Sequence, residues 1–291
     1  MKVSLTAHSA RSRLVAIAML LALAAAAAAV TGGSARASSG QVFKWSGGLR
    51  PVIVLEHGAW ADSSSWSGEI RLLQHDGFTV YAPPDPLRGL SFDSAYLHDF
   101  LTENAALQGK PIVLVGHSYG GAVITNAAVG DPEVKALVYV DAFIPAQGES
   151  IGQLLNAQPG SCLSGNPSDV FDLVPYPGAP AGDVDTYIKP SLFPGCFASG
   201  LPAELAARLA ATQQPLAASA VTEPSGPPAW LTIPSWAVIG TTDKVIPPTE
   251  LRFMATRARA RITDVDAGHL SLISAPAVVT RVIIDAAVAT S

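Results

Sequence analysis

The chain has 291 residues, of which 49% are hydrophobic and 14% are charged, and its formal net charge is −5. The apolar content excludes wholesale disorder, and the acidic balance excludes the basic surface that nucleic acids require. The 2 cysteines are too few for a zinc ribbon or a disulfide-dense scaffold.

The N-terminus has the composition of a secretory signal peptide. Residues 1–13 are basic without any acid, Leu14 to Val30 is an unbroken apolar run, and Ala35-Arg36-Ala37 supplies a small-x-small site. We therefore predict a signal peptide over residues 1–37, cleavage after Ala37, and secretion of residues 38–291 as one domain. The alternative is a retained membrane anchor, although this run is at the lower limit for a span. After cleavage we expect no stable membrane association and no nucleic-acid partner.

Short apolar segments alternate with helical segments through most of the remaining chain. The predicted strands are residues 52–56, 78–82, 112–115, 136–140, 236–239 and 261–265. The predicted helices are residues 63–75, 93–107, 119–129, 248–258 and 275–288. Continuous apolar strands suit a sheet that is covered on both faces, and strand–helix alternation makes it parallel. The fold class is therefore α/β, with a doubly wound, mostly parallel sheet.

Residues 145–230 break this alternation. They are rich in Pro, Gly, Ala and Ser and contain one clear helical segment, residues 202–212. We interpret them as a cap inserted between two strands, over the sheet edge where ligands bind. Cys162 and Cys196 both lie in the cap, and in an oxidising compartment they should form a disulfide. Two buried free thiols are the alternative.

A nucleophile motif lies between the third predicted strand and the following helix. Its sequence is Gly116-His117-Ser118-Tyr119-Gly120-Gly121, a G-x-S-x-G directly after a strand and directly before a helix. That context is typical of the turn that exposes a catalytic serine. Ser118 is therefore the candidate nucleophile.

The serine needs a base, and elimination among the six histidines favours His269. His269 follows the last predicted strand, where a loop can reach Ser118. His57 belongs to the loop after the first strand, where we expect a structural role. His117 lies inside the nucleophile motif, and we expect its side chain to point away from the catalytic face. An unperturbed imidazole predicts that activity falls near pH 6.5 as the base takes up a proton.

The base in turn needs a carboxylate that orients its ring. Asp243 comes shortly after a predicted strand. The order Ser, Asp, His along the chain is also the order found where a serine nucleophile sits on such a strand–turn–helix motif. Asp141 is the alternative acid, because it also ends a strand.

Two backbone N–H groups should bind the developing oxyanion. One belongs to Tyr119, the residue after the nucleophile. The second should come from the loop His57-Gly58-Ala59-Trp60, where Ala59 is the first candidate and Trp60 the second.

These motifs together resemble the α/β-hydrolase superfamily. The His57–Trp60 loop, the Gly116–Gly121 motif, Asp243 and His269 are similar to one branch of it. That branch contains small bacterial esterases, pyrethroid-hydrolase-like enzymes, plant methyl-ester esterases and hydroxynitrile lyases. The resemblance implies an α/β-hydrolase fold and hydrolysis of small-molecule esters through an acyl-enzyme, with no metal and no cofactor.

Four alternatives remain beside the esterase: a hydroxynitrile lyase, a C–C hydrolase, an amidase and a non-catalytic binding module. Hydroxynitrile lyases of this branch carry Lys directly after the catalytic His, whereas this chain has Leu270. A C–C hydrolase or an amidase could use the same triad. A non-catalytic binding module would be expected to lack the intact triad. We expect the cap aromatics, such as Phe193, Phe197 and Trp230, to line an apolar substrate pocket, and the alternative for each ring is packing between cap and core.

Overall fold

The computed structural model describes Trp45 and residues 48–291. The predicted signal peptide, residues 1–37, lies outside the described residues, so its prediction stays untested. Within the described part, no helix is both long and apolar enough to span a membrane.

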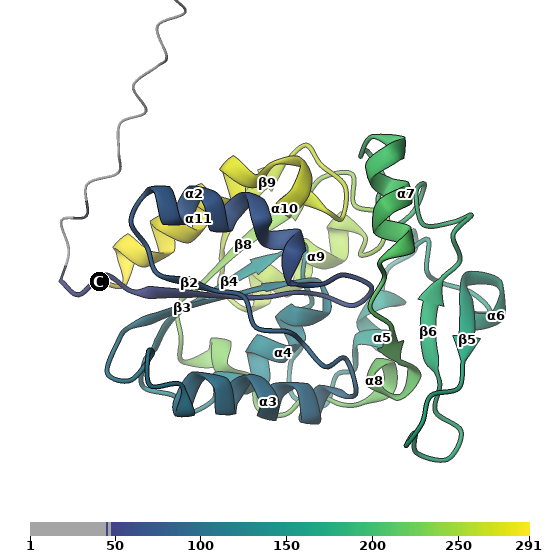
Figure 1. Cartoon of the computed structure of the whole chain (residues 1–291), viewed down its shortest axis with the longest axis horizontal. Coiled ribbons are helices and arrows are strands. Elements are labelled where there is room, and N and C mark those ends of the chain that lie inside the picture. The colour runs from purple at the N-terminus through teal and green to yellow at the C-terminus, as the bar shows by residue number, and fades with distance from the viewer. Residues whose placement is uncertain (1–44, 46–47) are drawn as a thin grey trace, which may run out of the picture. The chain divides into compact units, whose positions relative to one another are not determined.

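The core is a six-stranded parallel sheet with the strand order β2-β1-β3-β4-β8-β9 (Figure 1). The strands are β1 (Val52–Glu56), β2 (Val80–Tyr81), β3 (Ile112–His117), β4 (Val134–Val140), β8 (Ser235–Gly240) and β9 (Arg261–Val265). All six were predicted, and the parallel sheet is confirmed. Its centre is apolar because both faces are covered: every residue of β1, β3 and β8 is buried.

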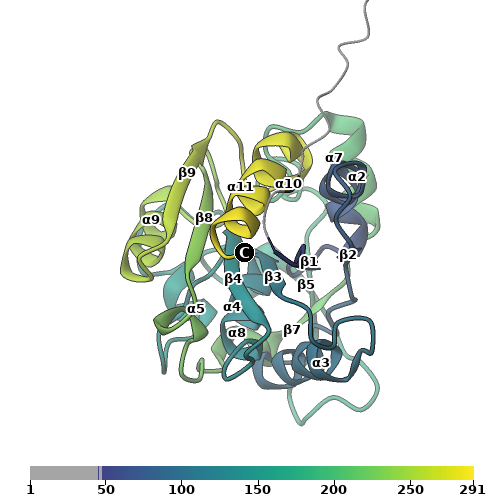
Figure 2. The same ribbon diagram turned by 90° about the vertical axis from the view of Figure 1, so that its left-hand side faces the viewer.

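Helices cover the two faces of this sheet (Figures 1 and 2). The 3-10 turn η1 (Ser63–Trp66), α2 (Ser67–His75), α10 (Ser271–Ser274) and α11 (Pro276–Ala289) are grouped on one face. The other face carries α3 (Leu90–Glu103) and α4 (Tyr119–Ala127), and α9 (Pro248–Arg257) packs beside β8 and β9. The last predicted helix, residues 275–288, is present as α11, and the short α10 that precedes it was not predicted. Pro276 occupies the first turn of α11, where its missing N–H costs nothing.

The segment between β4 and β8 contains more structure than the single helix that the sequence predicted. That helix is present as α7 (Ala203–Ala211). A second, antiparallel sheet joins β5 (Phe171–Val174), β6 (Asp185–Ile188) and β7 (Leu216–Ala217). Short helical turns complete the cap: α5 (Ile151–Leu155), α6 (Pro167–Val170), α8 (Ala218–Thr222) and η2 (Ala229–Leu231). The one predicted helix is thus confirmed, and the three cap strands were not predicted because all of them are short and β5 and β6 mix polar with apolar residues.

Two kinds of link fix the cap. The predicted disulfide between Cys162 and Cys196 is present and ties two cap segments together. The second link is Arg88, which lies outside the cap, just before α3. Its guanidinium donates to two cap groups, the Asp185 carboxylate of β6 at 2.7 Å and the Pro215 carbonyl at 2.9 Å. In Figure 1 the cap lies at one end of the parallel sheet, and the C-terminus lies at the other.

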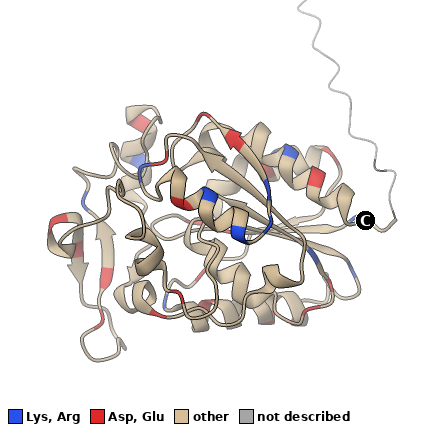
Figure 3. Cartoon of the chain, turned by 180° about the vertical axis from the view of Figure 1, so that it is seen from behind, with Lys and Arg blue, Asp and Glu red and all other residues tan. Residues whose placement is uncertain are grey.

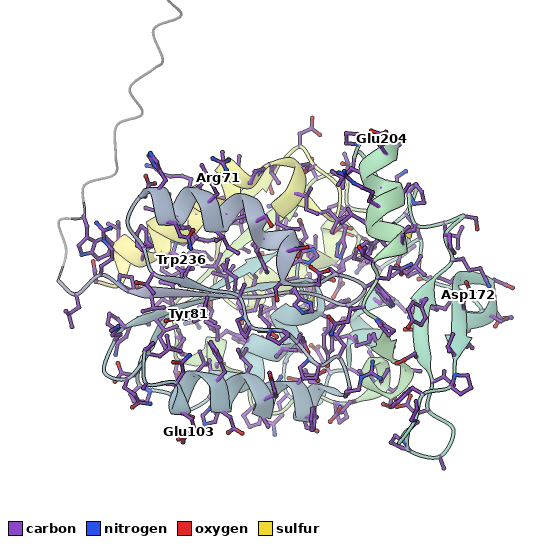
Figure 4. The ribbon with its side chains drawn as sticks, in the orientation of Figure 1. Arg71, Tyr81, Glu103, Asp172, Glu204 and Trp236 are labelled. Atoms are coloured by element: carbon purple, nitrogen blue, oxygen red, sulfur yellow. A yellow bond between two sulfur atoms is a disulfide. The ribbon has the colours of Figure 1, made fainter. Side chains whose placement is uncertain are left out.

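Charged residues are spread over the outer helices and loops (Figure 3). The outward side chains labelled in Figure 4, such as Glu204 on α7 and Asp172 on β5, follow the same distribution. Asp172 pairs with Lys189 at 2.6 Å, with the Asp172 side chain exposed and the Lys189 side chain partly exposed, so this ion pair contributes little to stability.

Glu69 on α2 is a buried acid that should destabilise the fold at neutral pH. Its side chain is inaccessible, neither carboxyl oxygen has a partner among the described residues, and burial raises its pKa to about 9. The folded state therefore keeps a proton that the unfolded state releases, so stability falls as pH rises from 4.5 towards 9. We expect Glu69→Met to raise the free energy of unfolding at pH 8 by on the order of 3 kcal/mol.

Thermal unfolding at several pH values checks this prediction. The gain in Tm should shrink as pH is lowered towards 5, because the unfolded state then also keeps the proton. Glu204→Met is the matched control, since Glu204 is exposed on α7. A gain that does not change with pH would contradict the assignment to Glu69 ionisation.

Candidate active site

Ser118 lies at the sharp turn between β3 and α4. Its φ of 52° and ψ of −120° place a non-glycine residue in a strained region. The turn requires close packing, because a Cβ on Gly116 would lie 2.5 Å from the Gly120 carbonyl oxygen, and a Cβ on Gly120 would lie 2.6 Å from the His57 carbonyl oxygen. The glycines therefore permit the sharp strand-to-helix turn that the motif predicts around Ser118.

The structure brings Ser118, His269 and Asp243 together at the carboxyl ends of the strands. The Ser118 hydroxyl lies 2.9 Å from His269 Nε2, and His269 Nδ1 lies 2.8 Å from Asp243 Oδ2. Asp243 Oδ1 accepts the amides of Val245 and Ile246 at 2.7 and 3.1 Å. These amides hold the carboxylate so that its second oxygen faces the imidazole.

Burial controls the protonation of this site. Burial lowers the pKa of His269 to about 3. It also raises the pKa of Asp243, while the hydrogen bonds from the two backbone amides lower that pKa. The imidazole is therefore neutral at physiological pH and can accept a proton from the serine.

The pH dependence should follow from this burial. The candidate base His269 can take a proton only when it is neutral, so its lowered pKa should move the acid limb of kcat/KM below pH 6.5, the value that an unperturbed imidazole predicts. Rates of p-nitrophenyl ester hydrolysis between pH 4 and 8 measure this limb. Half-maximal kcat/KM at or above pH 6.5 would contradict the effect of burial on His269.

The alternative acid, Asp141, does not contact His269. Its carboxylate instead accepts the amides of Gly240 at 2.6 Å and Ser271 at 3.3 Å. Asp141 also has a positive φ of 46°.

The two other histidines near the site support the backbone. His57 Nε2 accepts the Asp85 amide at 2.9 Å, so its Nδ1–H donates to the Gly58 carbonyl, and the expected structural role is confirmed. His117 Nε2 donates to the His269 carbonyl at 3.0 Å, so the expectation that His117 points away from the catalytic face was wrong. This contact spans 152 residues, and no local sequence signal predicts it.

The two candidate oxyanion donors lie beside Ser118. Among the described residues, no acceptor is bonded to the Ala59 or Tyr119 amide. The Trp60 amide, by contrast, donates to the Gln214 carbonyl of the cap at 3.0 Å, which removes the second candidate donor. The Tyr119 hydroxyl donates to the buried Asp93 carboxylate at 2.8 Å, which anchors this residue on α3.

A cavity of about 160 Å³ opens onto Ser118. Trp60 forms one wall and stacks on Phe171 of the cap, with ring centroids 5.4 Å apart. Most of the remaining lining is apolar: Phe143, Ile151, Leu155, Leu163, Leu216, Val221 and Val245. Asn156 and Ser164 add polar groups.

The cap aromatics predicted for the pocket pack elsewhere. Phe193 and Phe197 are buried against each other, and the Phe197 ring lies 5.1 Å from the His269 ring. The Trp230 indole donates to the Pro145 carbonyl, away from the cavity. None of the three rings lines the cavity, and Phe193 and Phe197 instead take the alternative that the sequence left open, packing between cap and core. Across the described residues, no group of three or more His, Cys, Asp or Glu side chains could hold a metal ion.

A family comparison agrees with this fold and site. The model of the alpha/beta hydrolase family matches residues 52–282. The chain belongs to the alpha/beta hydrolase family.

Two curated relatives of this alpha/beta hydrolase are enzymes. A carbendazim hydrolyzing esterase from Nocardioides sp. (strain SG-4G) is 36% identical over 112 residues, which are 35% of this chain and 46% of the relative. A probable hydrolase, R7, from Phoma sp. is 28% identical over 123 residues, 38% of this chain and 50% of the relative. The matches thus span about half of each relative.

Solved structures share the fold over most of the chain. A pyrethroid hydrolase from Sphingobium faniae JZ-2 has a TM-score of 0.61 at 22% identity, covering 81% of this chain and 97% of its own. Tomato methylketone synthase I has a TM-score of 0.67 at 17% identity, and the match covers 84% of this chain and 100% of the synthase chain.

Proposed function

We propose that this alpha/beta hydrolase is a secreted serine esterase that cleaves small to medium apolar esters through an acyl-enzyme. The observation that carries the proposal is the hydrogen-bonded series from Ser118 through His269 to Asp243, with distances of 2.9 and 2.8 Å. The esterase among the curated relatives supports the same reaction type.

In the first half of the reaction, Ser118 Oγ attacks the ester carbonyl while His269 Nε2 takes the hydroxyl proton. The Asp243 carboxylate holds the Nδ1–H tautomer and stabilises the imidazolium. The amides of Ala59 and Tyr119 donate to the oxyanion of the tetrahedral intermediate. His269 then gives its proton to the leaving alcohol, and the acyl group remains on Ser118.

In the second half, water replaces the alcohol. His269 takes a proton from water as it attacks the acyl carbonyl, and the same two amides bind the second oxyanion. Collapse of this intermediate releases the acid and returns the proton to Ser118. No cofactor takes part in this scheme.

The cavity supports the substrate class. Its mostly apolar lining and its volume of about 160 Å³ suit an uncharged acyl or alkoxy group of modest size. Leu270, which follows His269, is apolar and buried, so this position supplies no cation for a departing cyanide. The Cys162–Cys196 disulfide supports an oxidising compartment and thus secretion.

Covalent labelling tests the proposal directly. A fluorophosphonate probe should modify Ser118 of the purified protein, which peptide mass spectrometry can locate, and the labelled protein should lose hydrolysis of p-nitrophenyl acetate, butyrate and octanoate. A protein that neither hydrolyses these esters nor takes up the probe would contradict the proposal. Hydrolysis of anilides in preference to esters would favour an amidase.

A further inference from the structure

Asp141 is buried beside the candidate triad without touching its imidazole. It directly follows β4, and its side chain is fully inaccessible. One carboxylate oxygen accepts the Gly240 amide at 2.6 Å and the other accepts the Ser271 amide at 3.3 Å. A single side chain thus bridges two backbone segments that lie 31 residues apart.

The first of these segments leads to Asp243. Gly240 is the last residue of β8, and its carbonyl accepts the Asp243 amide at 3.2 Å. Any movement of the Gly240 peptide would therefore be passed to Asp243. The site is tightly packed, because a Cβ on Gly240 would lie 3.0 Å from the Asp141 carboxylate and 2.8 Å from the Gly268 carbonyl oxygen.

The second segment carries His269. Ser271 lies two residues after the histidine and opens α10, and its amide is the group that Asp141 binds. The His269 carbonyl is separately held by His117. The backbone that follows the imidazole is therefore held at two points, at the His269 carbonyl by His117 and at the Ser271 amide by Asp141.

The location of Asp141 is energetically unfavourable in itself. Burial is the main cause that raises the pKa of Asp141, and the nearby charge of Asp243 is the second. The hydrogen bonds from the two backbone amides lower this pKa only in part. Its positive φ adds backbone strain. An apolar residue would avoid these costs but could not accept two backbone amides.

We propose that Asp141 is a positioning residue, which fixes the distance between Asp243 and His269 by binding the backbone of both of their loops. The activity readout of this inference rests on the proposed esterase function. A spectroscopic readout does not, because the hydrogen bond between His269 and Asp243 exists without substrate.

Asp141→Asn is the test variant. Asn tolerates positive φ, so the substitution adds little backbone strain, but its amide offers only one acceptor oxygen and turns an NH₂ group towards the second amide. Asp131→Asn is the matched control: Asp131 is also buried and accepts the Glu133 amide at 2.8 Å, but it lies before β4, at the opposite end of that strand.

We expect kcat of Asp141→Asn to fall about 10- to 100-fold, while KM stays near the wild-type value. The far-downfield proton resonance of His269 Nδ1–H should shift or broaden in this variant and remain unchanged in Asp131→Asn. If Asp141→Asn does not fold, Asp141→Gly replaces it, because Gly accepts the φ of 46° without strain.

Unchanged kcat and resonance in a folded Asp141 variant would overturn the inference. So would a loss of kcat with an unchanged resonance, or an equal loss in Asp131→Asn. If the wild-type protein hydrolyses no ester and takes up no fluorophosphonate, the proposed function fails, and the resonance alone then decides the role of Asp141.

Discussion

Replacing Ser118 with alanine should lower kcat for p-nitrophenyl butyrate by about 10⁶-fold. The hydroxyl oxygen is the atom that would form the acyl-enzyme, and no other hydroxyl is hydrogen-bonded to His269 Nε2 among the described residues. Any remaining rate would come from binding and from the two oxyanion amides. Initial rates at saturating ester measure the loss.

The control for Ser118→Ala is Ser235→Ala. Ser235 is also buried and also loses one hydroxyl contact, to the Ile233 carbonyl, but it begins β8, at the end of the strand away from the site. Its kcat should match that of the wild type. A Ser118→Ala protein that is folded, by Tm, and retains more than about one hundredth of the rate would rule out Ser118 as the nucleophile.

Replacing Asp243 with asparagine should lower kcat about 10⁴-fold without unfolding the protein. We expect a loss because the new asparagine side chain can take only one orientation in this site. The amides of Val245 and Ile246 require an oxygen at the Oδ1 position, so the new NH₂ group must face His269. It would donate to Nδ1 and leave the proton on Nε2, where the imidazole can no longer accept the proton of Ser118.

Asp264→Asn is the control for this substitution, since Asp264 is an exposed acid on β9 that pairs with Arg252. It should leave kcat unchanged. Asp141 should not rescue Asp243→Asn, because its carboxylate is already bonded to Gly240 and Ser271. A loss below about tenfold in Asp243→Asn would mean that another group orients His269.

The sheet could be predicted because its signal is local. Runs such as residues 52–55 are apolar at every position, as expected of a strand that is covered on both faces. The cap strands carry no such signal: Phe171–Val174 and Asp185–Ile188 mix polar and apolar residues and are held by pairing with each other. The start of α3 at Leu90 was missed for a similar reason, since the amide of Ser91 in its first turn donates to the distant Glu223 carboxylate at 3.1 Å.

The residues of the candidate site also fall into two groups, those with a local sequence signal and those without one. Ser118 and His269 stand out because of their neighbours in sequence, a turn motif and a loop after the last strand. The sequence favoured Asp243 as the acid but left Asp141 as the alternative, since both follow strands at the same edge of the sheet. Only the positions of Gly240 and Ser271 in space show that one acid faces the imidazole and the other binds backbone.

Three residues around the nucleophile hold left-handed backbone conformations: Trp60, Ser118 and Asp141, with φ of 56°, 52° and 46°. Each such residue costs on the order of 1–3 kcal/mol. Trp60 and Asp141 offset this strain through stacking on Phe171 and through two backbone hydrogen bonds. A directed-evolution campaign that selects for heat resistance alone would thus be drawn to glycine at position 118, where the side chain is small. Libraries built to stabilise this hydrolase should keep Ser118 fixed, or screen turnover alongside survival.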